Sequence, residues 1–356
     1  MKFNSIIGNP PYQEIKATEK SSTNSAFASA LYPSFIDLSL NLTPDYISLI
    51  TPSRWMTKQG QGISNEWVDK MIKCNQYVCI HDFPNANDCF ENVEIKGGIN
   101  YFLIKTAYSG KCAFTTHTQG LDVTNTDYLD PIGSGIVVRD QNAMSIINKI
   151  VEVEGNYFIE KSFSSLVSPK HYFDRNELLN SNWKGYSKYK DDEHCIKYYL
   201  NKNLEECGYG WVKLSDIPKG HETISLCKIY IPMAGGTGND AQILGMPFYG
   251  EPQSVCSYTY LVIGYDKELH NFSESECKNI ISYIKTKFFR YMVSVKKKTQ
   301  NTTRDLFQFV PIQDFSDKSD IDWTKDVDNI NTQLYLKYNL GIFEQEYIES
   351  LIKSME

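Results

Sequence analysis

Residues 3–12 read Phe3-Asn4-Ser5-Ile6-Ile7-Gly8-Asn9-Pro10-Pro11-Tyr12, and this stretch decides the fold of the first part of the chain. The apolar run that ends at Gly8 predicts a buried β-strand. Two prolines then predict a stiff turn, because proline fixes φ and removes a backbone donor. The Asn9 carboxamide has one acceptor and two donors, so it can pair with an amino group and the ring nitrogen beside it. The Tyr12 ring offers a flat face on which an extruded base can stack. The stretch therefore predicts a strand that ends in a site for an aromatic amine, and an ordinary strand-to-turn exit is the alternative.

Further apolar runs alternate with segments of helical periodicity over about the first 110 residues. Strands followed by turns and helices predict an α/β sheet whose site lies at the carboxyl ends of the strands. We expect strands at 3–8, 46–50, 77–83 and 95–104, helices at about 25–42 and 64–73, and a mobile loop at 13–24.

The second half of the chain has a different amino-acid composition, rich in Tyr, Lys and Asn. It predicts an α+β domain with short strands and two helices. We therefore expect three parts: an α/β part at 1–110, a connecting segment at 111–160 and an α+β part at 161–356. Within them, residues 113–137 either pair as short strands or bridge the parts, strands lie near 229–231 and 258–263, and helices lie at about 274–294 and 344–354.

The composition is that of a globular protein, with 41% hydrophobic and 22% charged residues in 356. The nine cysteines have no C-x-x-C spacing, which argues against both a zinc site and a disulfide framework. No apolar run is long enough for a membrane span and no signal-peptide pattern is present, so we expect a cytoplasmic protein without a metal. The net charge of −7 argues against a purely electrostatic DNA binder more than against an enzyme that reads one site.

The stretch from Asn9 to Tyr12 resembles the catalytic motif of N6-adenine DNA methyltransferases of restriction-modification systems, in particular their gamma class. The resemblance implies that Asn9 and the Pro10 carbonyl accept hydrogen bonds from the target amine, that Pro11 completes the turn, and that Tyr12 stacks on the flipped adenine. It also implies transfer of a methyl group from S-adenosylmethionine to double-stranded DNA, that is, a site-specific, adenine-specific DNA methyltransferase.

Two later segments extend the resemblance. Residues 47–55 look like the family's strand that ends in Pro-Ser-x-Trp, and residues 88–95 look like its motif with an aromatic residue before a strand. By this resemblance Phe90 presses on the other face of the flipped base, and Trp55 lines the same pocket. Core packing is the alternative for Phe90, and a packing anchor is the alternative for Trp55.

The second half resembles the target-recognition region of one subfamily of these enzymes. Cations neutralise phosphates and amides read base edges, so we expect DNA contacts from Lys296, Lys297, Lys298, Gln300, Asn301 and Arg304. A solvated helix end is the alternative. A second basic patch combines Lys184, Lys188 and Lys190 with Tyr186 and Tyr189.

The chain departs from the family in one respect. The family binds S-adenosylmethionine with a glycine loop and an acidic residue upstream of the catalytic motif, which here begins at residue 9. The glycine-rich stretch 234–239 lacks the strand-loop-helix context of a cofactor loop and is interpreted as a recognition-domain loop. We therefore expect an incomplete cofactor site and a partial, Rossmann-like methyltransferase sheet followed by a recognition domain. The corresponding partners are double-stranded DNA and either a separate S-adenosylmethionine-binding chain or a restriction endonuclease subunit.

Two other functions remain open. The chain can be a non-catalytic DNA-specificity subunit, or a relic. Alternatively, Asp82 with Glu94 and Lys96 fits a short pattern for a magnesium-dependent nuclease, which needs two carboxylates to hold the metal.

Overall fold

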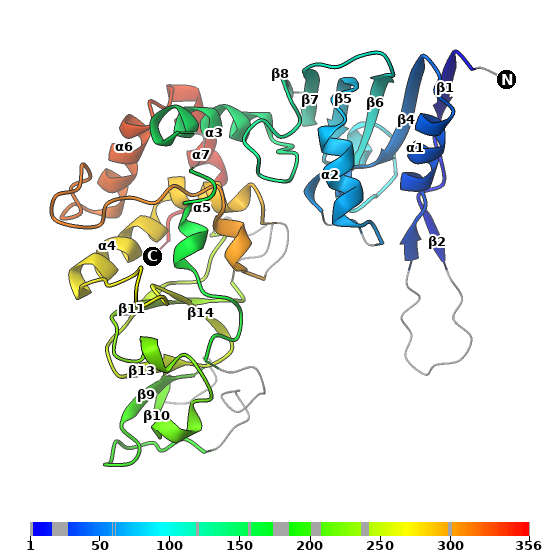
Figure 1. Cartoon of the computed structure of the whole chain (residues 1–356). Helices are drawn as coiled ribbons and strands as arrows, with labels where there is room; N and C mark the ends of the chain where they lie inside the picture. Colours follow the sequence, from blue (N-terminus) through cyan, green and yellow to red (C-terminus); the bar gives the residue numbers. More distant parts are fainter. Residues whose placement is uncertain are drawn as a thin grey trace, which may run out of the picture. The chain divides into compact units, whose positions relative to one another are not determined.

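The chain forms two compact units, Met1–Ser145 and Ile146–Glu356. The computed structural model describes residues 3–15, 28–58, 60, 62–118, 121–155, 158–173, 185–200, 208–235, 242–297 and 301–355. Figure 1 shows the elements of both units.

The first unit is built on a six-stranded sheet. Its strand order is β1 (Ser5–Gly8), β4 (Tyr46–Pro52), β6 (Ile99–Lys105), β5 (Tyr77–Phe83), β7 (Cys112–Thr118) and β8 (Leu121–Asp127). β1 is parallel to β4 and β5 is parallel to β7, whereas β6 is antiparallel to both β4 and β5. Strands β1, β4, β5 and β7 therefore end at the same edge of the sheet, where β6 begins.

The four expected strands of this unit are confirmed, but β1 is not buried as predicted. It lies at the edge of the sheet, and no strand among the described residues pairs with its outer side. Its apolar side chains divide between two environments: Ile6 packs against the core, and Ile7 is 81% exposed. The period of two in a strand produces this division, which an apolar run in the sequence does not reveal.

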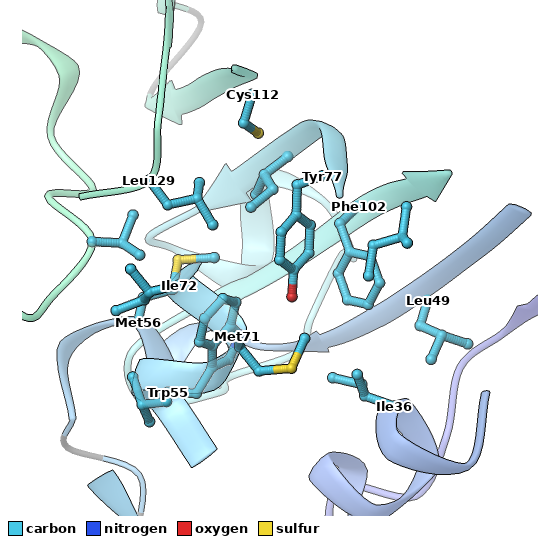
Figure 2. Close-up of a cluster of buried hydrophobic side chains, with 14 of the residues drawn as sticks. Ile36, Leu49, Trp55, Met56, Met71, Ile72, Tyr77, Phe102, Cys112 and Leu129 are labelled. Carbon is cyan, nitrogen blue, oxygen red and sulfur yellow. The ribbon is translucent and has the colours of Figure 1, made fainter. Parts of the chain in front are cut away.

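Two helices cover one face of the sheet. Helix α1 (Tyr32–Asn41) and helix α2 (Asn65–Lys73) contribute side chains to the same buried cluster as β4, β5 and β6. Figure 2 shows this cluster, with Trp55 and Met71 beside the Tyr77 ring. The side chain of Ser64 accepts a hydrogen bond from the backbone N–H of Trp67 and so caps α2, which explains why this helix begins where the sequence predicts.

The segment between β1 and α1 differs from the expected loop and early helix start. β2 (Gln13–Ile15) pairs antiparallel with β3 (Ala28–Ala30), so α1 begins at Tyr32 rather than near residue 25. Residues 16–24 of the expected mobile loop and residues 25–27 of the expected helix lie outside the described residues.

The sheet continues beyond residue 110. Residues 113–137 do pair as strands in part, because β7 and β8 form a hairpin at the far side of the sheet. Helix α3 (Gln141–Glu154) then begins in the first unit and ends in the second.

The second unit combines two three-stranded sheets with helices, as the α+β prediction requires. The first sheet has the order β10 (Tyr209–Val212), β9 (Ile196–Tyr199), β13 (Ser254–Cys256), and the second has the order β12 (Phe248–Gly250), β11 (Lys228–Pro232), β14 (Tyr260–Ile263). The helix expected at 274–294 is two helices, α4 (Glu274–Lys285) and α5 (Lys287–Ser294). Thr286 has an extended backbone, and its side chain accepts from the N–H of Phe289 to cap α5.

Two helices close the second unit, α6 (Val327–Lys337) and α7 (Ile342–Leu351), and the latter confirms the helix expected near the end of the chain. Of the helices in the described ranges, none combines the length and the apolar character that crossing a membrane requires.

Candidate active site at the edge of the first sheet

The predicted catalytic stretch lies where β1 ends. Asn9 is exposed, Pro10 is buried and Tyr12 is half-buried. The backbone carbonyl of Tyr12 accepts a hydrogen bond from the N–H of Leu31 at 3.0 Å, which ties the stretch to the start of α1. The turn is therefore held in place while the Asn9 carboxamide faces solvent.

The side chains of Asn9 and Tyr12 interact. Burial raises the pKa of the Tyr12 hydroxyl above its ordinary value, the nearby Cys89 raises it further, and a hydrogen bond with the Asn9 side chain lowers it. A neutral Tyr12 follows at physiological pH, so its ring stays available for stacking and its hydroxyl can orient the carboxamide of Asn9.

The loop between β5 and β6, residues 84–98, carries Cys89, which is near enough to Tyr12 to raise the pKa of its hydroxyl. The loop begins with a 3₁₀ turn, η2 (Ala86–Asp88), and the N–H of Phe90 donates to the carbonyl of Ala86 at 2.9 Å. Phe90 is half-buried, one residue after Cys89. The structure thus brings the segment that carries Phe90 to the catalytic turn, across almost 80 residues of sequence.

Trp55 has a different environment from the one that the resemblance implies. It is wholly buried in the 3₁₀ turn η1 (Ser53–Thr57), stacks on Tyr77 at 6.2 Å between ring centroids and meets Trp67 edge-on at 6.0 Å. A side chain in this position cannot touch a base, so the packing alternative describes Trp55.

A buried polar network, which the sequence does not predict, lies at the same edge of the sheet. Asp82 near the end of β5 is fully buried, and its carboxylate accepts from Arg139 Nε at 2.8 Å, from Arg139 Nη2 at 2.9 Å and from Ser53 Oγ at 2.6 Å. Asn100 donates to Ser53 Oγ at 3.2 Å and to the Thr51 carbonyl at 3.1 Å. An aspartate inside an apolar strand indicates that a partner for its charge exists. The sequence does not identify that partner, because Arg139 lies 57 residues further along the chain.

These contacts bear on the nuclease pattern. Both carboxylate oxygens of Asp82 are engaged by protein donors, and Glu94 is exposed on the 84–98 loop. The described ranges contain no group of three His, Cys, Asp or Glu side chains arranged to hold a metal ion. The geometry thus gives Asp82 a structural role.

The expected DNA-contact residues of the second unit lie in different environments. Lys296 contacts Gln308 at 2.8 Å and Asp305 at 3.3 Å. Lys297 is 4% exposed, and its ammonium donates to the carbonyls of Gly235 at 2.6 Å and Ile243 at 2.5 Å. Lys297 is therefore a buried structural residue and cannot reach a phosphate. Lys298 and Gln300 lie outside the described residues.

Arg304 and Asn301 remain at the surface. Arg304 donates through Nε to the Ser164 carbonyl at 2.9 Å and, with Lys170 and Gln308, lines an open depression of about 530 Å³. Asn301 is exposed and pairs with Ala234 in an isolated bridge. Residues 236–239 of the glycine-rich stretch lie outside the described ranges.

The second basic patch is described only in part, because Lys184 lies outside the described residues. Lys188 is exposed, and Tyr189 is exposed as well. Lys190 lies over the Trp211 ring at 5.3 Å, which leaves its ammonium within reach of an anion.

Comparison with known proteins defines the class of the first segment. Residues 1–90 match the family described as Eco57I restriction-modification methylase. The match contains both the Asn9–Tyr12 turn and Phe90. The resemblance to adenine-specific methylases of restriction-modification systems is therefore confirmed for this part of the chain.

A particular relative is a protein from Mycoplasma pneumoniae described as an uncharacterized adenine-specific methylase. It is 37% identical over 116 residues, which cover 33% of this chain and 26% of that protein. The matched region thus spans about a quarter of the length of this relative.

Solved structures with some similarity are also restriction-modification enzymes. The type IIG restriction endonuclease BpuSI is 12% identical, with a TM-score of 0.33 over 92% of this chain and 44% of that one. The ATP-dependent type ISP enzyme LlaBIII, bound to DNA, is 11% identical, with a TM-score of 0.35 over 94% and 29%. Similarity at this level assigns no role to any residue here.

Proposed function

We propose that this chain transfers the methyl group of S-adenosylmethionine to N6 of adenine in DNA, as part of a restriction-modification system. The observation that carries the proposal is the Asn9–Tyr12 turn at the carboxyl edge of the sheet, with its carboxamide exposed and hydrogen-bonded to Tyr12, within the segment that matches the methylase family.

The Asn9 carboxamide oxygen and the Pro10 carbonyl accept hydrogen bonds from the two N–H groups of the adenine amine, which raises the nucleophilicity of its nitrogen as the methyl group arrives. Tyr12 stacks on the flipped base, and Phe90 closes the pocket from the 84–98 loop. A few kcal/mol of unstacking energy is offset by this stacking and hydrogen bonding. The proximity of Cys89 to Tyr12 supports the place of the loop in this pocket.

The cofactor S-adenosylmethionine needs a binding part that the described residues do not form. The unpaired outer side of β1 and the exposure of Ile7 support a further strand and covering layer at this edge, next to Asn9. Another stretch of polypeptide, on the same or on a separate chain, would supply them.

The second unit binds DNA through Arg304 and Lys170, which line the open depression, and through the exposed Asn301, with Lys188 and Lys190 as further phosphate contacts. Exposure of Arg304 and Asn301 supports this set, and the burial of Lys297 removes that residue from it.

The test is methyl transfer by the native assembly, isolated from its own cells through an affinity tag on this chain. With labelled S-adenosylmethionine, the wild-type assembly should methylate adenine in DNA, and an Asn9→Ala assembly of the same composition should lose activity by about 100-fold or more. Undiminished transfer by the Asn9→Ala assembly would refute the site.

The second candidate is a DNA-specificity subunit without catalysis. The partial span of the relative supports it, because a chain can retain recognition when the rest of the enzyme lies elsewhere. In this case the assembly would bind one DNA sequence selectively, and neither Asn9→Ala nor Tyr12→Ala would change any methylation.

A further inference from the structure

Arg139 holds both ends of the 84–98 loop. Two of its N–H groups bind Asp82, two residues before the loop begins, and Arg139 Nη1 donates to the carbonyl of Gly97, near the end of the loop, at 2.7 Å. One planar guanidinium thus spans the entry and the exit of the segment that carries Cys89 and Phe90. A lysine cannot make this set of contacts, because it lacks the rigid fork of donors.

The loop is closed tightly at this point. Gly98 has φ of +75°, and an added Cβ would collide with the backbone carbonyl of Phe83 on the opposite stem. The carbonyl of Gly98 also accepts from the N–H of Ser53 at 3.1 Å. The two stems are therefore in contact, and the position of the loop depends on what fixes them.

Arg139 itself is held firmly. The carbonyl of Arg139 accepts a hydrogen bond from the hydroxyl of Thr116, and two residues earlier the N–H of Val137 donates to the carbonyl of Met56 at 2.8 Å. Its side chain is only 14% exposed. Because Arg139 is itself held in place, its hydrogen bonds restrict the movement of the two ends of the loop.

We propose that Arg139 is a positioning residue of the active site, which holds the 84–98 loop against the Asn9–Tyr12 turn so that Phe90 can close on the target base. The proposal rests on the proposed function for its catalytic consequence. Its structural part, that Arg139 fixes the loop, stands independently of that function.

The structural part is tested by amide hydrogen exchange on the purified chain. Arg139→Lys keeps the positive charge beside the buried Asp82 and removes the forked set of guanidinium N–H donors. Loss of its hydrogen bonds should speed exchange at the amides of Phe90 and Gly98 about 10- to 100-fold. Exchange in α2, away from the Arg139 contacts, should change much less than exchange at these two amides.

A matched control is Lys70→Met, which removes the exposed ion pair between Lys70 and Asp37 in the same unit, at 2.8 Å. This variant should leave the loop amides unchanged. Equal loop exchange in Arg139→Lys and wild type, or an increase spread evenly over the whole sheet, would overturn the proposal.

The catalytic part is tested in the native assembly. Arg139→Lys should lower kcat by about 10-fold or more while KM for DNA stays within about twofold, because the loop is displaced and the recognition unit is intact. In Arg139→Ala, added guanidinium at low concentration should restore part of the activity. If Arg139→Ala lost activity only because the protein was less stable, guanidinium would not restore it. An unchanged kcat in Arg139→Lys would refute this part. Failure of the proposed function can be distinguished from failure of this proposal. In the first case Asn9→Ala would keep full methyl-transfer activity, and amide exchange in the 84–98 loop would still increase in Arg139→Lys.

Discussion

At the scale of single residues, the side chains of Asn9 and Tyr12 interact within one turn at the end of β1. Asn9 and Tyr12 are separated only by Pro10 and Pro11, so a short turn brings their side chains together. Trp55 and Lys297 have the residue types of a base pocket and a DNA contact, but both are buried. Their burial depends on packing with segments far away in the sequence, which a motif does not specify.

The role of Tyr12 as a stacking surface can be separated from its hydrogen bond with Asn9. Tyr12→Phe keeps the ring and loses the hydroxyl, so methyl transfer should fall by no more than about 10-fold, the cost of one net hydrogen bond. Tyr12→Ala loses the ring and should reduce transfer by about 100-fold or more. Initial rates with labelled S-adenosylmethionine measure both, and equal rates for the two variants would show that stacking plays no part.

Lys297 and Arg304 should respond to substitution in opposite ways. Lys297→Met leaves the carbonyls of Gly235 and Ile243 without their donor, so the free energy of unfolding should fall by about 1–3 kcal/mol while DNA affinity stays constant. Arg304→Ala should weaken DNA binding and reduce its dependence on salt, with little change in stability. Thermal melts and DNA titrations at two salt concentrations distinguish the two. A loss of DNA affinity without destabilisation in Lys297→Met would contradict this assignment.

At the scale of secondary-structure elements, the sequence predicts where strands lie better than which side of them is covered. The apolar runs of β4 and β5 identify both strands, and the helix expected at about 64–73 is α2. The sequence does not predict the break at Thr286 between α4 and α5, because apolar side chains continue at helical spacing on both sides of it. Helices α3 and α6 are additional to the predicted elements.

The face of the sheet opposite to the helices carries a histidine pair that makes stability depend on pH. His81 on β5 and His117 on β7 stack and interact through Nδ1 and Nε2 at 3.0 Å. Burial lowers the pKa of His81, His117 lowers it further, and Asp122 opposes the shift. The unfolded chain therefore binds this proton more readily than the folded chain does.

It follows that the stabilising effect of neutral His81 is fully present above the ordinary histidine pKa of about 6.5 and declines as pH falls through the lowered folded value. Melting temperature should decrease between about pH 7 and pH 5, and His81→Gln should weaken this dependence. Burial also lowers the pKa of His270 in the second unit, so part of the effect should remain. An identical pH profile in wild type and His81→Gln would contradict the role of His81.

At the scale of the whole molecule, β1 is one of the two edge strands of the sheet in the first unit, and the Asn9–Tyr12 turn follows it directly. The proposed base site lies at the end of β1, and no strand among the described residues pairs with the outer side of β1. The edge position of β1 is the observation behind the proposal that a further stretch of polypeptide contributes to cofactor binding here. Which polypeptide completes the sheet cannot be predicted from side chains in this chain.

This arrangement predicts how the cofactor binds. Calorimetry with S-adenosylmethionine should detect no tight binding by the purified 356-residue chain, with or without DNA, and should detect binding by the assembly isolated from its native cells. Tight binding by the chain alone would mean that the described and remaining residues already form a cofactor site.

The most direct test of the central claim is a map of N6-methyladenine in the DNA of the native cells, compared between wild type and a strain with Asn9→Ala at the chromosomal locus. This comparison supplies every partner at its natural level. We predict that methylation at one recognition sequence disappears in the Asn9→Ala strain while the abundance of the protein is unchanged. Unaltered methylation in that strain would contradict the assignment of Asn9 as the residue that binds the target amine.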